Sequence, residues 1–209
     1  MLRLLLLCFF VTFPCYAQEA SNWALVKEQN TVRVYTRTIP NSNYKEFKGE
    51  VSINANLSDV LTFIKEPKLC PDWQYKCIYK LRLNKNYIYK LSNLPWPLND
   101  RYTVMKSEEF FDSETKTHTI NLKNIRRNLL AENIKNLLPD EGSTVQMRTS
   151  DGYWKFDLSH APNIQITHKM HGDPAGVIPA GLANLGVINA AFVSLDNLRM
   201  HFSLKANKK

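Results

Sequence analysis

The feature that most constrains the fold is a long periodic segment near the C-terminal end of the chain. Apolar residues recur there at intervals of three or four, the period of one helix face: Leu182, Leu185, Ile188, Phe192, Leu195, Leu198 and Phe202. A helix over residues 179–204 would be about 39 Å long at roughly 1.5 Å per residue, enough to cross the sheet of a small domain. The spacing therefore predicts a helix that covers a sheet.

The segment before this helix has the composition of a loop. Pro174 and Pro179 lack a backbone N–H, and Gly172 and Gly176 permit backbone angles that most residues avoid. Pro179 also suits the first turn of a helix, where its missing N–H would have no partner in any case. We therefore expect a hinge-like loop followed at once by the helix.

Two interpretations of this helix remain open. It could close the core of an α+β domain, the usual role of buried leucines, or it could cover a cavity. Gly181 and Gly186 favour the cavity, because each costs about 1 kcal/mol relative to Ala inside a helix and so indicates close packing or a bend. Asn184 and Asn189 add polar groups that need protein or ligand partners once buried.

The first residues of the chain have the layout of a secretory signal peptide, residues 1–17. Arg3 precedes an apolar stretch, and a polar sequence follows Ala17. The apolar stretch is about ten residues, well short of the roughly 20 that a membrane-spanning helix needs. We therefore expect an exported protein, periplasmic or secreted. At 44% hydrophobic residues, its mature chain, residues 18–209, should form one domain with a sizeable core.

Cleavage at that point would leave two cysteines, Cys70 and Cys77. An even pair in an exported protein favours a disulfide that pins the turn around Trp73, and two free thiols are the alternative. No histidine lies nearby in sequence to complete a zinc site, so we expect no metal.

The chain is basic, with a net charge of +8, or 8 − 1 = +7 without Arg3. Its cations are spread along the sequence, which is typical of a solvated surface. Such a surface could make transient contact with an anionic membrane. No nucleic-acid-binding motif accompanies the charge, so we expect no nucleic-acid partner, and we expect a monomer.

Between the two ends, alternating patterns predict mostly strands. We expect a short helix over residues 22–30 and another ending at Lys65. Asp151-Gly152 has the sequence of a hairpin turn. The predicted strands are residues 31–39, 47–53, 77–83, 87–94, 101–111, 117–125, 145–149, 153–158 and 163–170. This order predicts an α+β architecture in which an antiparallel sheet wraps the last helix.

Three motifs follow one another in a suggestive order. Cys-Pro-Asp-Trp occupies residues 70–73, and Pro-Trp-Pro-Leu-Asn-Asp-Arg occupies 95–101. Asp-Pro-Ala-Gly-Val-Ile-Pro-Ala at 173–180 precedes Leu-Asp-Asn-Leu-Arg at 195–199. Together they closely resemble the START (steroidogenic acute regulatory protein-related) lipid-transfer domains, especially exported bacterial ones. The resemblance implies a helix-grip fold, in which a curved antiparallel sheet and the C-terminal helix enclose one lipid or sterol-like molecule.

Three positions depart from that family pattern. Gly181 stands where an aromatic residue is more frequent, Tyr102 where an acid is usual, and Gln146 where an arginine is expected. These positions lie in or near the expected cavity wall, so they leave the identity of the ligand open without affecting the expected fold.

The last helix should supply the cavity wall. An apolar ligand gains roughly 0.8 kcal/mol for each CH₂ removed from water, so a preformed apolar cavity could hold it without any cofactor. We expect Asn189 to be a polar contact. The expected apolar wall residues are Leu182, Leu185, Ile188 and Phe192.

Two segments could open the cavity: the loop 94–100, which contains Trp96 and Pro97, and the hinge 172–181, which contains Pro179. Trp96 could face a membrane or, as the alternative, could be a packed turn aromatic. We expect Asp100 and Arg101 to form a structural ion pair that fixes the first of these loops, and Arg101 could also act as a hydrogen-bond hub.

No catalytic motif of the nucleophile-elbow, zinc-protease, phosphate-loop or dinucleotide type occurs. His168 and His171 are three apart in a predicted strand, so they should lie on opposite faces and make a poor metal pair. The alternative to a carrier is a helix-grip enzyme of cyclase or hydrolase type acting on an apolar substrate. A third hypothesis is a protein that docks on the envelope through its basic surface. A cavity with a strongly perturbed His or carboxylate would favour the enzyme.

Overall fold

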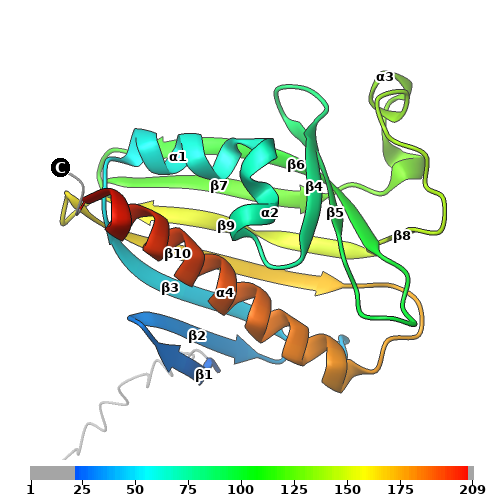
Figure 1. The fold of residues 1–209 in the computed structure, drawn as a ribbon, viewed down its shortest axis with the longest axis horizontal. Coiled ribbons are helices and arrows are strands. Elements are labelled where there is room, and N and C mark those ends of the chain that lie inside the picture. Colours follow the sequence, from blue (N-terminus) through cyan, green and yellow to red (C-terminus); the bar gives the residue numbers. More distant parts are fainter. Residues whose placement is uncertain (1–21, 207–209) are drawn as a thin grey trace, which may run out of the picture.

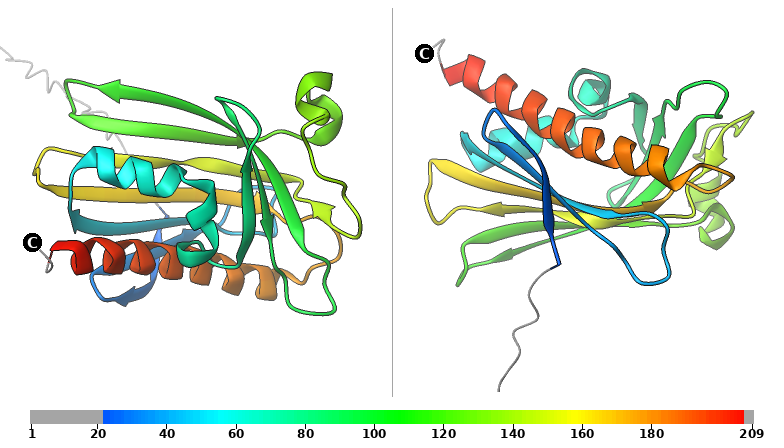
Figure 2. Two further views of the ribbon diagram at one scale, coloured as in Figure 1. Left: turned by 45° about the horizontal axis from the view of Figure 1, so that its top comes forward. Right: turned by 90° about the horizontal axis from the view of Figure 1, so that it is seen from below.

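The computed structural model describes residues 22–206, and the predicted signal peptide, residues 1–17, lies outside them. One ten-stranded sheet dominates, in the order β1-β2-β3-β10-β9-β7-β6-β5-β4, with β8 beside β6. The sheet curves around helix α4 (Ala180–Ala206), which crosses its concave side (Figures 1 and 2). This arrangement confirms the predicted α+β helix-grip fold.

All pairings along the main path of the sheet are antiparallel, and only β8 pairs in parallel. The described part of the chain also contains three shorter α-helices, α1 (Leu57–Lys65), α2 (Cys70–Trp73) and α3 (Glu132–Lys135). Within residues 22–206, no helix has the length and hydropathy needed to span a membrane. The strands are β1 (Ala24–Gln29), β2 (Val32–Arg37), β3 (Glu46–Asn54), β4 (Cys77–Arg82), β5 (Tyr87–Ser92), β6 (Arg101–Asp112), β7 (Thr117–Asn124), β8 (Val145–Gln146), β9 (Thr149–Asp157) and β10 (Asn163–Asp173).

The helix predicted over residues 22–30 is wrong, because this segment forms the edge strand β1. Its residues are mostly exposed, so their apolar spacing carried little information. Asn30 and Thr31 have φ angles of 53° and 64° and join β1 to β2 with Gln29 opposite Val32. Two central residues with positive φ make the tight hairpin turn that matches the twist of a sheet. This turn pairs the segment with β2, so it forms a strand and not a helix.

The hairpin predicted at Asp151-Gly152 is also wrong, because both residues lie inside β9. Gly152 pairs with Met170 of β10. A Cβ atom added to Gly152 would lie only 1.9 Å from the Lys169 carbonyl oxygen. The carboxylate of Asp151 accepts a hydrogen bond from the Asn124 N–H at 2.9 Å. Glycine is therefore needed here for close strand packing and not for a turn.

The main core lies where α4 rests on β2 and β3. Leu195 and Leu198 are fully buried in it, together with Phe156 and Ile166 of the sheet. A Cβ at Gly49 of β3 would lie 2.5 Å from Leu195 Cδ1, so the absence of a side chain lets the helix approach. The helix is thus held at one side of the concave face.

A second cluster lies on the opposite face of the sheet, beneath α3. It contains Tyr89 and Tyr102, whose rings stack with centroids 5.3 Å apart. The Tyr102 hydroxyl donates a hydrogen bond to Glu141 at 2.5 Å. The remaining buried members are Leu91, Val104, Leu130 and Ile134. Strands β5 and β6 therefore bury these tyrosines on the outer face of the sheet. The alternate residues of both strands point to the concave side.

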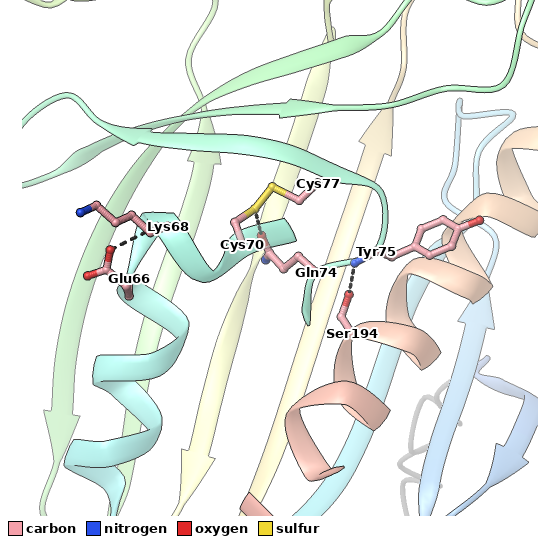
Figure 3. Close-up of a disulfide and its surroundings, with 7 residues drawn as sticks. All are labelled: Glu66, Lys68, Cys70, Gln74, Tyr75, Cys77 and Ser194. Carbon is pink, nitrogen blue, oxygen red and sulfur yellow. Dashed lines mark hydrogen bonds between the residues drawn. A yellow bond between two sulfur atoms is a disulfide. The ribbon is translucent and has the colours of Figure 1, made fainter. Parts of the chain in front are cut away.

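The predicted disulfide between Cys70 and Cys77 is present and joins α2 to the start of β4 (Figure 3). The segment that it encloses is bonded to α4, because the Tyr75 N–H donates to Ser194 Oγ at 3.1 Å. The Asn197 side chain likewise donates to the Trp73 carbonyl oxygen at 3.2 Å. The disulfide therefore fixes a segment that bridges the sheet and the last helix.

We expect Gly152→Ala to lower the free energy of unfolding by roughly 2–4 kcal/mol, because the added methyl group forces β9 away from β10. The matched control is Gly181→Ala in α4, where a Cβ would meet no atom within 4 Å, and this change should gain up to about 1 kcal/mol. Urea unfolding of both variants measures the difference. Equal stabilities would contradict the close approach of the two strands.

A basic, mostly apolar cavity as the candidate functional site

A cavity of about 580 Å³ lies between the concave face of the sheet and α4. Its volume falls within the range of roughly 300–1,000 Å³ that is usual for small-molecule sites. Apolar residues from strands β5, β6, β7, β9 and β10 make up much of its wall: Ile88, Met105, Ile120, Leu122, Trp154 and Met170. The cavity lies beside the contact of α4 with β2 and β3, between the helix and the concave face of the neighbouring strands.

Helix α4 contributes only some of the wall residues that its periodicity predicted. Leu182, Leu185 and Asn189 line the cavity. Ile188 and Phe192 instead pack in the main core between the helix and the sheet. Both groups repeat every three or four residues, so they form two neighbouring stripes on one helix. Sequence spacing alone merged these stripes into a single face.

The glycines of α4 are not explained by close packing. A Cβ at Gly181 or at Gly186 would meet no atom within 4 Å. Gly186 lies in the cavity wall, so its missing side chain leaves part of the cavity open. Asn184 lies nearby and accepts a hydrogen bond from the Lys45 N–H at 2.8 Å, which satisfies one of the polar groups that the sequence placed in this helix.

One end of the cavity is bounded by the β5–β6 loop and by the loop before α4. Leu94 and Pro95 line it from the first loop, and Pro174 and Ile178 line it from the second. The buried guanidinium of Arg101 joins the two loops. Its Nε donates to the Pro174 carbonyl oxygen at 2.6 Å, and other nitrogens of the same group bond the carbonyl oxygens of Ala175 and Asn99.

The predicted ion pair between Asp100 and Arg101 is absent from the described part of the chain. Asp100 instead accepts hydrogen bonds from the Leu94 N–H at 3.0 Å and from the Asn93 side chain at 3.1 Å. Neighbouring residues on a strand point to opposite faces, so the two side chains diverge. Arg101 is the hydrogen-bond hub that the sequence suggested, and each residue fixes a different part of the loops.

Apolar side chains surround this end of the cavity and face solvent. Trp96 is 92% exposed and Val177 is 97% exposed, and Leu182 and Leu185 are also exposed. The interpretation of Trp96 as a packed turn aromatic is therefore wrong. Pro97 follows Trp96 in the same loop, and Pro179 is exposed directly before α4. We call Trp96, Val177, Leu182 and Leu185 the apolar rim.

Two lysines from adjacent strands face the interior of the cavity. Lys80 of β4 and Lys90 of β5 are directly opposite in the antiparallel register, and Lys90 is in turn opposite Thr103 of β6. Neither ammonium group has a hydrogen-bond or ion-pair partner within residues 22–206. Burial lowers the pKa of Lys80 to about 7, with smaller contributions from the charges of Lys90 and Arg82. Burial also lowers the pKa of Lys90.

His168 of β10 lines the same cavity. Its ring stacks on Trp154, with centroids 3.8 Å apart and planes inclined by 8°. Burial lowers the pKa of His168 to about 3, and the charges of Lys90 and Lys80 contribute, so the imidazole is neutral at physiological pH. His168 Nδ1 and Thr103 Oγ1 are buried without a hydrogen-bond partner.

Negative charge is scarce in the cavity wall. Among the described residues that line it, Glu109 is the one carboxylate. Glu109 is already paired, with Lys65 Nζ at 2.7 Å and with His118 Nε2 at 3.3 Å. The cationic members of the wall are Lys65, Lys76, Lys80, Arg82, Lys85, Lys90 and Arg101. The cavity wall is therefore mostly apolar, and most of its ionisable side chains are basic.

Sequence analysis did not identify Lys80, Lys90, Thr103 or His168 as site residues. A signal was present, because Ile-Tyr-Lys-Leu occurs twice, ten residues apart, at 78–81 and 88–91. Such alternation normally directs the apolar residues inward and the lysines to solvent. Here Tyr79 and Tyr89 pack against the segment around α3 on the outer face of the sheet. The lysines that follow them therefore face the cavity.

These features define a helix-grip domain with an internal ligand-sized cavity, and comparisons with known proteins agree with that class. A crystal structure of a STAR-related lipid transfer protein from Xanthomonas axonopodis is 25% identical, covers 87% of this chain and 99% of its own, and superposes with a TM-score of 0.73. Human StAR-related lipid transfer protein 5 is 14% identical, with 91% of each chain covered and a TM-score of 0.74.

The sequence is also 25% identical over 184 residues to an uncharacterised protein from Pseudomonas aeruginosa, with 86% of each chain covered. No family model matches the chain. The structural likeness extends over most of the chain, so the protein has the fold of START lipid-transfer domains, as the sequence motifs indicated.

We expect the burial of Lys80 to make stability depend on pH. Its pKa is about 7 in the folded protein and 10.5 in its ordinary state, so between these values the unfolded chain binds more protons and stability rises with pH. The penalty is fully present below about pH 7 and is lost as the pH approaches the unfolded pKa. Lys80→Met should therefore raise the free energy of unfolding by on the order of 1–3 kcal/mol near neutral pH.

Urea unfolding at a series of pH values checks this prediction. The matched control is Lys155→Met, because Lys155 is exposed on β9 and its loss should change stability little at any pH. Two results would contradict the proposed burial of Lys80. One is a Lys80→Met variant that is less stable than the wild type at neutral pH, and the other is a gain in stability that does not shrink in alkali.

Proposed function

We propose that this protein binds one lipid or sterol-like molecule in the cavity between its sheet and α4 and carries it between lipid surfaces. The observation that carries the proposal is the cavity itself, about 580 Å³ in volume and lined mainly by apolar side chains. Burial of an apolar ligand there yields roughly 0.8 kcal/mol per CH₂ without covalent chemistry. The Xanthomonas axonopodis structure, whose fold this chain shares, is that of a lipid transfer protein.

The gate in this proposal is the end of the cavity between the β5–β6 loop and the start of α4. Trp96 and Pro97 lie in the first segment, and Pro179 lies at the second. Arg101 bonds the β5–β6 connection to the carbonyl groups of Pro174 and Ala175. Ligand entry therefore requires either that these hydrogen bonds break or that both loops move together away from the sheet.

The apolar rim is the surface that would meet a membrane. Exposed tryptophan and aliphatic side chains around a cavity entrance favour insertion at a lipid–water interface, where an aromatic ring can stay partly hydrated. The net charge of the mature chain, 8 − 1 = +7 without Arg3, would strengthen transient contact with anionic lipids. We place this activity outside the cytoplasm, on the basis of the signal-peptide pattern and the disulfide.

Native mass spectrometry of the purified exported protein should show one apolar molecule bound per chain. Gly186→Phe should lower this occupancy roughly tenfold, because its ring would fill open space in the cavity wall. Gly181→Phe is the control, since Gly181 has equal free space but lies outside the wall. The proposal fails if the wild type contains no lipid and takes up none from vesicles.

Trp96→Ser should slow the transfer of a fluorescent lipid between vesicles and leave its equilibrium binding unchanged. The physical reason is that the exposed indole contacts the membrane but is not needed to enclose the ligand. Stopped-flow transfer rates and a separate binding titration measure the two effects. Unchanged transfer rates would show that the apolar rim has no part in membrane contact.

One observation favours a second candidate function, an enzyme acting on an apolar substrate. The cavity holds titratable groups with displaced pKa values, namely His168 at about 3 and Lys80 at about 7. A desolvated lysine beside another cation is one known way to activate an amine nucleophile. The mass spectra separate the two functions, since an enzyme would return a supplied ligand with altered mass. A carrier would return it unchanged.

A further inference from the structure

The cavity contains a polar group of side chains that an uncharged lipid would leave unsatisfied. Lys80 and Lys90 are opposite each other on adjacent strands, where Cβ atoms are about 4.5–5.5 Å apart. Like charges in that position repel each other. Thr103, opposite Lys90, and His168 of β10 add two buried atoms without hydrogen-bond partners. We call Lys80, Lys90, Thr103 and His168 the inner polar cluster.

The protein itself supplies no counter-charge to this cluster. Within the described residues, neither lysine takes part in an ion pair, and the single carboxylate in the wall, Glu109, is paired with Lys65 and His118. Burial lowers the pKa values of both lysines, which means that the folded protein holds these charges at an energetic cost. An anion placed between the two ammonium groups would remove that cost and form charge-assisted hydrogen bonds.

The position of the cluster defines the orientation of a ligand. Lys90 precedes Leu94 of the entrance loop by four residues, so it lies roughly 13 Å from that entrance along β5. Apolar side chains, among them Ile88, Met105 and Leu182, occupy the same cavity. A molecule that matches both the lysines and the apolar wall has an anionic end and an apolar body.

We propose that the ligand is an anionic amphiphile, with a carboxylate or phosphate group held between Lys80 and Lys90 and its apolar part along the cavity wall. The inference rests on the proposed lipid-binding function and names its ligand class. Thr103 lies opposite Lys90 on the next strand, and His168, whose ring stacks on Trp154, lines the same cavity. The cavity volume suits a single-chain or fused-ring amphiphile.

Titration with three ligands of equal chain length tests the proposal: palmitate, hexadecyl phosphate and the uncharged hexadecanol. The wild-type protein should bind at least one of the two anions about 30-fold or more tightly than hexadecanol. Whichever anion binds more tightly identifies the head group as carboxylate or phosphate. The Lys80→Met/Lys90→Met variant should lose this preference and should bind hexadecanol at least as well as the wild type.

Lys155→Met is the matched control and should keep the full preference for anions. The single variants Lys80→Met and Lys90→Met provide the same comparison if the double variant does not fold. Equal binding of palmitate, hexadecyl phosphate and hexadecanol by the wild type, or an anion preference that survives both lysine substitutions, would overturn this inference and leave lipid binding intact. Failure to bind all three ligands, together with an empty native mass spectrum, would instead overturn the proposed function.

Discussion

The contact between α4 and strands β2 and β3 determines the rest of the structure. Leu195 reaches the backbone of β3 because Gly49 has no side chain, and Leu198 and Phe202 extend the contact along the helix. This contact holds α4 over one side of a curved sheet. Strands β5 and β6 on the other side then lie away from α4, and the cavity is the space between them and the helix. The site is therefore a consequence of where one helix is anchored.

The same geometry explains why the cavity is both apolar and positive. Strand β5 and the first half of β6 are buried on their outer side, because α3 and its flanking loop cover Tyr89, Leu91, Tyr102 and Val104. The tyrosines occupy that outer side, and the alternation of a strand then directs Lys80 and Lys90 inward. Two unpaired ammonium groups in such a place oppose folding. In the binding mode that we propose, the charge of an anionic ligand offsets this cost.

The fold could be predicted from the sequence to a large extent. Three local features of the sequence favour the same structure that tertiary packing requires. They are the spacing of apolar residues in α4, the alternation of apolar and polar residues in most strands, and the cysteine pair. The two errors in secondary structure have local causes as well. Asn30-Thr31 forms a turn that has no glycine to reveal it. Asp151-Gly152 has the sequence of a turn, but its glycine serves the close approach of two strands.

The cavity wall was less predictable, because it depends on the rotation of α4 and on which face of each strand is covered. Spacing alone could not separate Leu185 from Ile188 on the same helix. Nor could it show that Lys90 faces inward, since that depends on the loop between β7 and β8 covering the opposite side. Arg101 was correctly expected to be a hydrogen-bond hub, but two of its partners, Pro174 and Ala175, lie more than seventy residues away in sequence.

The disulfide connects the redox state of one cysteine pair to the shape of the cavity. Residues between Cys70 and Cys77 form part of the cavity wall and also hold α4 through Ser194 and Asn197. In a reducing compartment this wall segment would lack its covalent closure, and the enclosed space would be less well defined. Oxidation of Cys70 and Cys77 therefore closes a segment that carries part of the cavity wall, and such a bond persists in oxidising surroundings.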